Sequence, residues 1–231
     1  MVTKIVRKIW REVKRPFRKL VGGHYAHKWI GPDQWNGEHS HKSIEIYEEL
    51  ANLDRAQLQE KYSNYWKRIE PVVQFCQGVV LELGCGSGNV TRWINEVDAV
   101  EKIYCIDLFE KPISQLKERG YSKAIPICGD ITQNDVQEKI KEQNVDTVVL
   151  CEIIEHLPQQ LENEILKSIR QYVRSQVTKW VVSTPIGFML NPHHCRGFSK
   201  VEFIAHLKKH YGAIDSIHYT EIQQTGCGWF Y

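Results

Sequence analysis

The stretch VVLELGCGSGNVT, from Val79 to Thr91, decides the fold class of this chain. It passes from an apolar run typical of a buried strand into the glycines Gly84, Gly86 and Gly88, and then into a helical pattern. Glycine permits tight turns with positive φ and lets a ligand approach the backbone closely. The stretch therefore predicts a strand, a tight turn and a helix, with a ligand site at the turn.

The same alternation continues along the chain and predicts an α/β fold. A mostly parallel sheet covered by helices on both faces follows from such a pattern, giving three αβα layers, and we expect two further helices between residues 44 and 75. Near the end we expect a helix, a strand and a short edge strand made by GCGWFY. The strands are expected at residues 79–83, 103–107, 124–128, 147–151, 180–183 and 213–219, and the helices at 89–96, 112–119, 134–142, 161–173 and 200–211.

The glycine turn lacks the features of a phosphate-binding loop. A dinucleotide site would need a third glycine at position 89, which is Asn89, and no Gly-Lys-Ser/Thr sequence ends a P-loop. An acid, Asp107, nevertheless ends the second expected strand, 107 − 84 = 23 residues after Gly84, where a carboxylate can accept both hydroxyls of a ribose. Asp130, after the third strand, can accept a hydrogen bond from an adenine amino group, with Ile131 against the ring. The pattern favours a nucleoside ligand without a pyrophosphate.

Four blocks in this order, VLELGCGSG, IYCIDLF, ICGDI and DTVVLCEIIEHLP, resemble the class I S-adenosylmethionine-dependent methyltransferases. The resemblance implies a Rossmann-like sheet ordered 3-2-1-4-5-7-6 with an antiparallel last strand, and S-adenosylmethionine as the cofactor. It further implies that Glu82 and the glycine turn hold the methionine end, and that the block around Glu152 closes the pocket. The cofactor-binding residues implied in this way are Glu82, Gly84, Cys85, Gly86, Gly88, Asp107, Leu108, Asp130, Ile131 and Glu152.

Acids and histidines that follow the fourth and fifth strands are the candidate catalytic residues. In one hypothesis His156 or His194 acts as a general base beside Glu155, because an imidazole titrates near neutrality. In the other, Glu152, Glu155, His156 and His193 or His194 bind a divalent metal, as the similarity to small-RNA 2′-O-methyltransferases with Glu-x-x-Glu-His implies. We favour the first hypothesis, because the blocks are also similar to bacterial small-molecule, quinone and sugar methyltransferases that need no metal.

Charge is distributed unevenly between the beginning of the chain and the rest. Residues 1–20 contain eight Lys/Arg and one acid, a net +7, so the net charge of +2 leaves −5 on the remainder. We therefore expect residues 1–21 to form a basic amphipathic helical tail suited to a membrane surface or to docking on protein, while the acidic body makes nucleic acid an unlikely partner. No apolar run reaches about 18 residues, and we expect a cytoplasmic protein, peripheral at the inner face of a membrane.

The 231 residues suit one methyltransferase domain with appendages. We expect the tail at 1–21, a lid or connector with helices at 22–75 and the methyltransferase domain at 76–231. The aromatic-rich lid, including Trp35 and Trp66, suits a sugar or a flat ring, although such residues also form cores. Arg196 suits a substrate carboxylate or phosphate, or a surface ion pair.

Together these features predict a methyltransferase that acts on an oxygen of a small or lipid-linked acceptor, a sugar first and a quinone second. The alternatives are a metal-dependent RNA 2′-O-methyltransferase and a non-catalytic cofactor-binding or scaffold protein.

Overall fold

The computed structural model describes residues 49–50, 52–141, 144–172, 178–186, 194–212, 219–222 and 227–230. The predicted basic tail and most of the predicted lid, including Trp35, lie outside these residues. Within them, no helix has both the length and the apolar character needed to cross a membrane.

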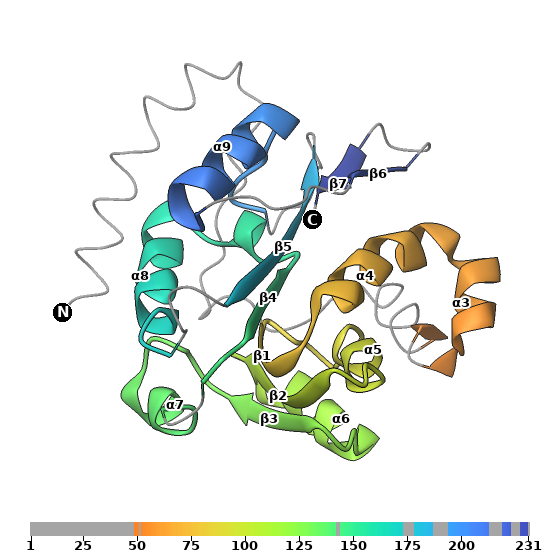
Figure 1. Cartoon of the computed structure of the whole chain (residues 1–231), viewed down its shortest axis with the longest axis horizontal. Helices are drawn as coiled ribbons and strands as arrows, with labels where there is room; N and C mark the ends of the chain where they lie inside the picture. Colours follow the sequence, from red (N-terminus) through yellow and green to blue (C-terminus); the bar gives the residue numbers. More distant parts are fainter. Residues whose placement is uncertain are drawn as a thin grey trace.

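The described strands form one seven-stranded sheet in the order β3-β2-β1-β4-β5-β7-β6 (Figure 1). Five of them pair in parallel and confirm the predicted Rossmann-like sheet. The strands predicted at 124–128 and 147–151 match the structure residue for residue, while β2 begins three residues before its predicted start. The parallel strands are β1 (Gly78–Leu83), β2 (Val100–Asp107), β3 (Ala124–Cys128), β4 (Thr147–Cys151) and β5 (Lys179–Ile186).

Two short strands extend the sheet beyond β5. Strand β7 (Cys227–Phe230) pairs antiparallel with β5 on one side and with β6 (Tyr219–Ile222) on the other. The prediction that the GCGWFY segment forms an edge strand is therefore wrong, because β7 lies inside the sheet and β6 occupies the edge. The two antiparallel pairings make β6 parallel to β5. The strand predicted at 213–219 reaches the described residues only at its last position, where β6 begins.

Helices cover both faces of the sheet, as Figure 1 shows. Alternate residues of the same strand enter opposite cores, so Val80 packs with α4, α5 and α6, whereas the adjacent Leu81 packs with α7, α8 and α9. Strands buried on both faces are expected in a parallel sheet. The helices are α3 (Arg55–Lys61), α4 (Ser63–Phe75), α5 (Thr91–Asn95), α6 (Glu110–Arg119), α7 (Asn134–Glu138), α8 (Gln159–Ile169), α9 (Lys200–His210) and the 3₁₀ turn η1 (Ile154–His156).

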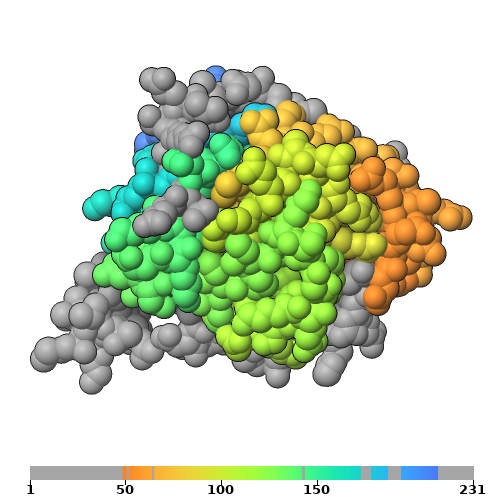
Figure 2. Space-filling view, turned by 60° about the horizontal axis from the view of Figure 1, so that its bottom comes forward, coloured from red at the N-terminus to blue at the C-terminus, as the bar shows by residue number. Residues whose placement is uncertain are grey.

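Helix α4 belongs to the same core as the sheet. Its Trp66 is 4% exposed and meets the Trp93 ring edge-on, with ring centroids 5.2 Å apart. Trp66 is thus a core residue and not part of an aromatic binding surface. In the space-filling view, the orange and gold residues of α3 and α4 flank the yellow to green residues from β1 to α6 (Figure 2). This packing brings α4 beside the strand ends that carry the predicted site.

Candidate functional site

The predicted cofactor residues gather at one edge of the sheet. Parallel pairing sets Leu83 of β1 beside Ile106 of β2 and Leu150 of β4, so the carboxyl ends of these strands finish side by side. In open α/β sheets ligands bind at this edge. The glycine turn follows β1, Asp107 ends β2, and Glu152 directly follows β4.

The glycine turn requires glycine for two separate reasons. Gly84 and Gly88 have φ of 65° and 88°, and a Cβ on them would lie 2.0 Å from Ile153 Cδ1 and 2.4 Å from Leu116 Cδ1, respectively. Both of these positions are thus closely packed. At Gly86, whose φ is 54°, no heavy atom of the described residues lies within 4 Å of the position that a Cβ would take. The backbone of Gly86 therefore faces open space, where a ligand can approach it.

Asp107 joins the glycine turn to the end of β2. Its Oδ2 accepts a hydrogen bond of 3.0 Å from the Gly86 amide, and its Oδ1 accepts one of 3.0 Å from the Phe109 amide. These donors hold the carboxylate in place, and an ionised carboxylate can accept about four hydrogen bonds in all. The adjacent Leu108 is 48% exposed and provides an apolar side chain beside this carboxylate.

Asp130 and Ile131 lie next to this position, after β3. The Gly129 amide donates to the Asp107 carbonyl oxygen at 2.9 Å, which joins the two segments. Asp130 Oδ1 accepts hydrogen bonds of 2.8 Å from both the amide and the hydroxyl of Thr132. Ile131 is only 4% exposed and packs in the core with Val136. Asp130 thus stabilises the turn after β3 through its hydrogen bonds with Thr132, and Ile131 anchors that turn in the core.

Glu82, which is expected to hold the methionine end of the cofactor, lies in the interior at the end of β1. It is 2% exposed, and its Oε2 accepts a hydrogen bond of 2.7 Å from the Thr91 hydroxyl at the start of α5. Burial raises the pKa of Glu82 to about 7, against the lowering effect of the Thr91 hydrogen bond. Glu82 therefore braces the turn between β1 and α5. Cys85 is also buried, and its amide donates to the Ile106 carbonyl oxygen at 3.2 Å.

Glu152 has a strained backbone. Its φ of 58° lies in the left-handed region, and it is the non-glycine residue with positive φ among those described. Ser183 makes two hydrogen bonds with Glu152. The Glu152 amide donates to the Ser183 carbonyl oxygen at 3.1 Å, and the Ser183 hydroxyl donates to Glu152 Oε1 at 2.8 Å. Such strain, on the order of 1–3 kcal/mol, persists where surrounding contacts enforce it and is concentrated at functional sites.

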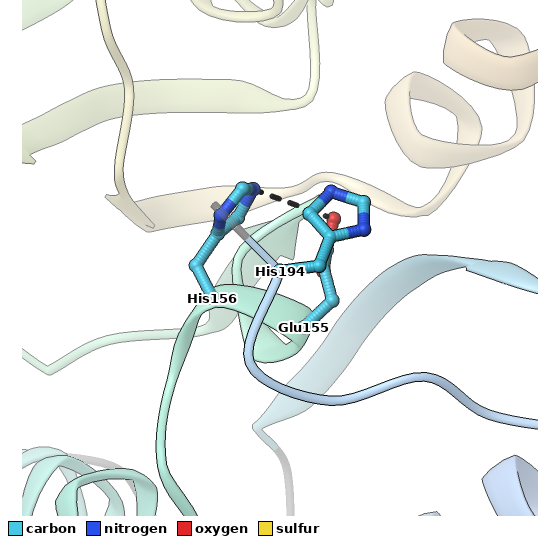
Figure 3. A group of neighbouring side chains, drawn as sticks. All are labelled: Glu155, His156 and His194. Atoms are coloured by element: carbon cyan, nitrogen blue, oxygen red, sulfur yellow. Dashed lines mark ion pairs between the residues drawn. The ribbon is translucent and has the colours of Figure 1, made fainter. Parts of the chain in front are cut away.

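Glu155, His156 and His194 form a compact group at the ends of β4 and β5 (Figure 3). One ligand atom from each lies within 4.8 Å of the others, and the two imidazole rings meet edge-on with centroids 4.7 Å apart. Glu155 is 2% exposed and accepts a hydrogen bond of 3.1 Å from the Thr184 hydroxyl, whereas the His156 side chain is 37% exposed. Burial, and then repulsion from Glu152, raises the pKa of Glu155 well above its ordinary value.

This grouping agrees with only part of the predicted metal set. It contains Glu155 and His156 together with His194, while Glu152 is held by Ser183 instead and His193 lies outside the described residues. One carboxylate and two imidazoles are a donor set that fits zinc or another divalent transition metal. The same three groups fit a general base with a neighbouring acid, so the geometry is compatible with both hypotheses.

A buried charge network, which the sequence did not reveal, fixes the segment that carries His194. The amides of Cys195 and Arg196 donate to the Glu155 carbonyl oxygen at 2.9 and 3.1 Å. Arg196 Nε donates to the Ile154 carbonyl oxygen at 3.1 Å, and Arg196 Nη1 lies 2.8 Å from Oε2 of the buried Glu162. Arg196 is therefore a structural link between η1 and α8, and its ion pair with Glu162 is buried and not at the surface.

Glu162 is the centre of this network. Besides Arg196, His206 Nε2 lies 2.8 Å from Glu162 Oε1, and the Tyr211 hydroxyl donates to the same oxygen at 2.6 Å. Burial alone would raise the pKa of Glu162, but these hydrogen bonds and the charge of Arg196 outweigh it and lower the pKa to about 2. The partners of Glu162 lie 34 to 49 positions away from it in the sequence, so no local sequence pattern could predict this network.

Comparison with known proteins finds a family match over the middle of the chain. Residues 81–177 match the family described as the methyltransferase domain. The tRNA N(3)-methylcytidine methyltransferase trm141 of Schizosaccharomyces pombe is 24% identical over 129 residues, which are 54% of this chain and 48% of that protein. An uncharacterized methyltransferase of a Geobacillus species is 25% identical over 142 residues, or 62% and 60% of the two chains. The chain thus spans about half to three-fifths of the length of these relatives.

Solved structures share the fold at low sequence identity. The methyltransferase domain of bacterial CtHen1-C superposes with a TM-score of 0.54 and 19% identity over 72% of this chain and 97% of that one. The complex of DhpI with S-adenosylhomocysteine gives a TM-score of 0.53 and 16% identity over 81% and 92% of the two chains. A methyltransferase from Leishmania major gives 0.58 and 11% identity over 87% and 84%.

Proposed function

Because residues 81–177 place this chain among the class I S-adenosylmethionine-dependent methyltransferases, we propose that it methylates an oxygen atom of a small or lipid-linked acceptor. S-adenosylmethionine is the cofactor. When bound, it supplies a methyl group on a sulfonium that is already activated for displacement. The protein then has to hold the nucleoside, align the acceptor and accept the proton that the hydroxyl loses.

The nucleoside site fits residues that the structure brings together. Asp107 presents a fixed carboxylate to the ribose, Leu108 offers an exposed apolar side chain, and the Gly86 backbone faces open space. Asp130 directly follows Gly129, whose amide donates to the Asp107 carbonyl oxygen, so Asp130 would face the adenine. A nucleoside without a pyrophosphate needs no further glycine at Asn89, which agrees with this turn.

The observation that supports proton removal is the contact between His156 and His194 above the buried Glu155. The half-exposed His156 imidazole can accept the acceptor's proton at its Nε2, which lies 3.8 Å from Glu155 Oε1. An ionised Glu155 carboxylate beside this nitrogen would stabilise the imidazolium that forms. A positioned base of this kind contributes roughly 10²- to 10⁴-fold to proton transfer.

The preference for a small or lipid-linked acceptor rests on charge. The chain beyond residue 20 carries a net −5, and phosphate backbones bind basic surfaces. The acceptor class that we propose first is a sugar, and the second is a quinone. The basic residues 1–21 would be attracted to the anionic cytoplasmic face of a membrane, where a lipid-linked acceptor would be within reach. Flotation with anionic liposomes, comparing the full chain with a chain that starts at residue 22, tests that association.

Metal-assisted methylation of RNA is the second candidate. The Glu155, His156 and His194 ligand atoms lie close enough together for one ion. Two similar proteins bear on the substrate, since one is named as a tRNA methyltransferase and a structure with a TM-score of 0.51 and 15% identity is titled small RNA methyltransferase HEN1. The residues that would hold the ion are these three, and the ion would polarise the attacking hydroxyl group.

One experiment separates the two candidates. Purified protein is incubated with methyl-labelled S-adenosylmethionine and either a small-molecule and lipid extract or total RNA, with and without EDTA. The proposal predicts label in the first extract that survives EDTA and is lost in His156→Ala and His194→Ala, but not in His210→Ala, a control histidine on α9. Label in RNA that EDTA abolishes would replace the proposal with the second candidate. Absence of S-adenosylhomocysteine binding by calorimetry would favour a non-catalytic scaffold.

A further inference from the structure

We propose that Arg196 positions the His156–His194 pair for methyl transfer, and that the buried carboxylate of Glu162 acts on the reaction through Arg196. The inference rests on the proposed function, in which this pair of imidazoles removes the proton of the acceptor. Both residues act through others, so they are positioning residues and not catalytic residues. The proposal gives helices α8 and α9, which contribute Glu162 and its partner His206, a role in the reaction.

The two histidines come from segments far apart in the sequence, and backbone hydrogen bonds hold these segments together. The amides of Cys195 and Arg196 donate to the Glu155 carbonyl oxygen at 2.9 and 3.1 Å. Glu155 directly precedes His156 in η1, and Cys195 directly follows His194. Figure 3 shows the chain that carries His194 passing against the η1 turn. The edge-on contact of the two rings therefore depends on this junction.

The Arg196 side chain adds a second connection at the junction. Its Nε and Nη2 donate to the Ile154 carbonyl oxygen at 3.1 and 2.5 Å, which binds one edge of the guanidinium to the first residue of η1. Its Nη1 donates to Gln159 Oε1 at 3.0 Å, at the start of α8. The guanidinium also lies over the Phe198 ring, 5.2 Å from its centroid. A planar group with contacts on its edges and on one face is held in one orientation.

Glu162 provides the counter-charge on the other side of this guanidinium. Its Oε2 lies 2.8 Å from Arg196 Nη1 and accepts a hydrogen bond of 3.2 Å from Gln159 Nε2. Its Oε1 accepts a hydrogen bond of 2.6 Å from the Tyr211 hydroxyl and lies 2.8 Å from His206 Nε2. An ionised carboxylate accepts about four hydrogen bonds in all, so these partners occupy it. Glu162 is therefore equipped to hold Arg196 and not to bind a substrate or an ion.

Burial makes the ion pair sensitive to the loss of either partner. The side chains of Arg196 and Glu162 are 16% and 1% exposed. Removing one member of a buried pair leaves the other charge uncompensated, so it moves toward water or draws water in. Arg196 would then release its hydrogen bonds to η1, and the two imidazoles would move relative to each other. A displacement on the order of 1 Å at reacting groups can lower a rate about 10²-fold. A carboxylate on α8 thereby affects proton removal at His156.

The contact between the rings can be measured without an acceptor. Protein with isotope-labelled histidines should show a nuclear Overhauser effect between the ring protons of His156 and His194, whose centroids are 4.7 Å apart. EDTA is present throughout, so that no bound ion can hold the rings together. We expect the effect to be lost in Arg196→Met and in Glu162→Gln. Arg196→Lys should retain it at reduced intensity, because the charge opposite Glu162 remains while the fork of donors is lost.

Kinetics connect this contact to the reaction. Methyl transfer from labelled S-adenosylmethionine to the small-molecule and lipid extract is followed at saturating cofactor. Arg196→Met should slow the transfer about 100-fold, and Arg196→Lys should recover part of the loss. The affinity of both variants for S-adenosylhomocysteine, measured by calorimetry, should stay within about twofold of that of the unchanged protein. Tyr211→Phe, which removes one donor to Glu162 and leaves its charge, should slow the transfer less than Glu162→Gln.

Leu207→Ala is the matched control for stability. Leu207 is 8% exposed on α9 and packs in the same core as Phe198 and Phe203, so its truncation destabilises the protein without removing a charge. Urea denaturation gives the free energy of unfolding of each variant, and the transfer rates are measured at a temperature at which all of them are folded. Leu207→Ala should keep the ring contact and the rate of the unchanged protein.

The outcomes that contradict the proposal differ from those that contradict the function. A nuclear Overhauser effect that persists at full intensity in Arg196→Met, or that is absent from the unchanged protein, would overturn the positioning role, and so would a Leu207→Ala rate as low as that of Arg196→Met. An unchanged ring contact and rate in Glu162→Gln would overturn the action of Glu162 through Arg196. Failure of the unchanged protein to transfer any label would instead contradict the proposed function, and the ring contact alone would then decide whether Arg196 holds the pair.

Discussion

The carboxylate of Asp107 accepts a hydrogen bond of 3.0 Å from the backbone amide of Gly86. The residue predicted to hold the ribose thus also fixes the turn that faces the ligand. Because one side chain joins the ends of β1 and β2, a change at Asp107 affects the nucleoside site in two ways, through the lost ribose contact and through the released turn.

The first prediction concerns this residue. Asp107→Asn removes the charge and one acceptor, so the affinity for S-adenosylhomocysteine, measured by calorimetry, should fall about 10- to 100-fold, as expected for loss of charged hydrogen bonds. Asp135→Asn, an exposed change on α7, is the matched control and should leave the affinity unchanged. Equal affinities for the two variants would show that the ribose binds elsewhere.

The second prediction separates backbone strain from steric overlap in glycine positions. Gly120→Ala, at φ of 63° with no described heavy atom within 4 Å of the added Cβ, should lower the free energy of unfolding by about 1 kcal/mol. Gly88→Ala adds overlap with Leu116 Cδ1 at 2.4 Å and should cost about 2–4 kcal/mol. Urea denaturation of both variants checks this difference, and similar costs would mean that Leu116 moves aside freely.

The third prediction concerns the pH dependence caused by Glu82. Because its pKa is raised to about 7 in the folded protein, its protonated form contributes stability that is complete below the ordinary pKa of 4.5 and is lost as the pH rises to 7. Glu82→Gln mimics the protonated acid. Its free energy of unfolding relative to the unchanged protein should therefore increase by about 3 kcal/mol between pH 4.5 and pH 8.

Urea denaturation at several pH values without cofactor measures this trend. Glu101→Gln, at an exposed position of β2, serves as the control and should show no such increase. A pH-independent difference between Glu82→Gln and the unchanged protein would show that Glu82 is ionised in the folded state at neutral pH.

The fourth prediction has the opposite sign. The pKa of Glu162 is lowered to about 2, so its ionised form contributes stability that is complete above the ordinary pKa of 4.5 and is lost as the pH falls toward 2. Glu162→Gln should cost about 3 kcal/mol at pH 7, and the cost should shrink below pH 4.5. Denaturant titrations from pH 3 to pH 7 measure this, with the exposed Glu164→Gln on the same helix as control. A cost that does not change with pH would show that packing, and not charge, is lost.

The features that could be predicted from the sequence depend on short-range patterns. The strands at 124–128 and 147–151, the glycine turn and the acid at Asp107 follow from apolar periodicity and from the spacing of residues along one strand–turn–helix unit. Glu155 and His156 could be grouped for the same reason, because they share one turn after β4.

The features that could not be predicted depend on contacts between distant segments. Arg68 meets Glu152 only because α4 packs against the sheet, and Glu162 meets Arg196, His206 and Tyr211 only because α8 and α9 lie together. The role of Glu82 depends on its burial, which its position at the end of a strand did not distinguish from exposure toward a ligand. In each case the sequence shows an ionisable side chain but not the distant residue that contacts it.

The position of β7 between β5 and β6 means that the order of the strands in space differs from their order in the chain. Among the described strands, β6 is joined to the sheet through β7 alone. The two short strands are neighbours in the sequence and can pair with each other first, but this pair joins the sheet only when β7 docks on β5, which is a contact between segments far apart in the sequence. Assembly of this side of the sheet is expected to be a late event that begins only after the parallel strands have formed.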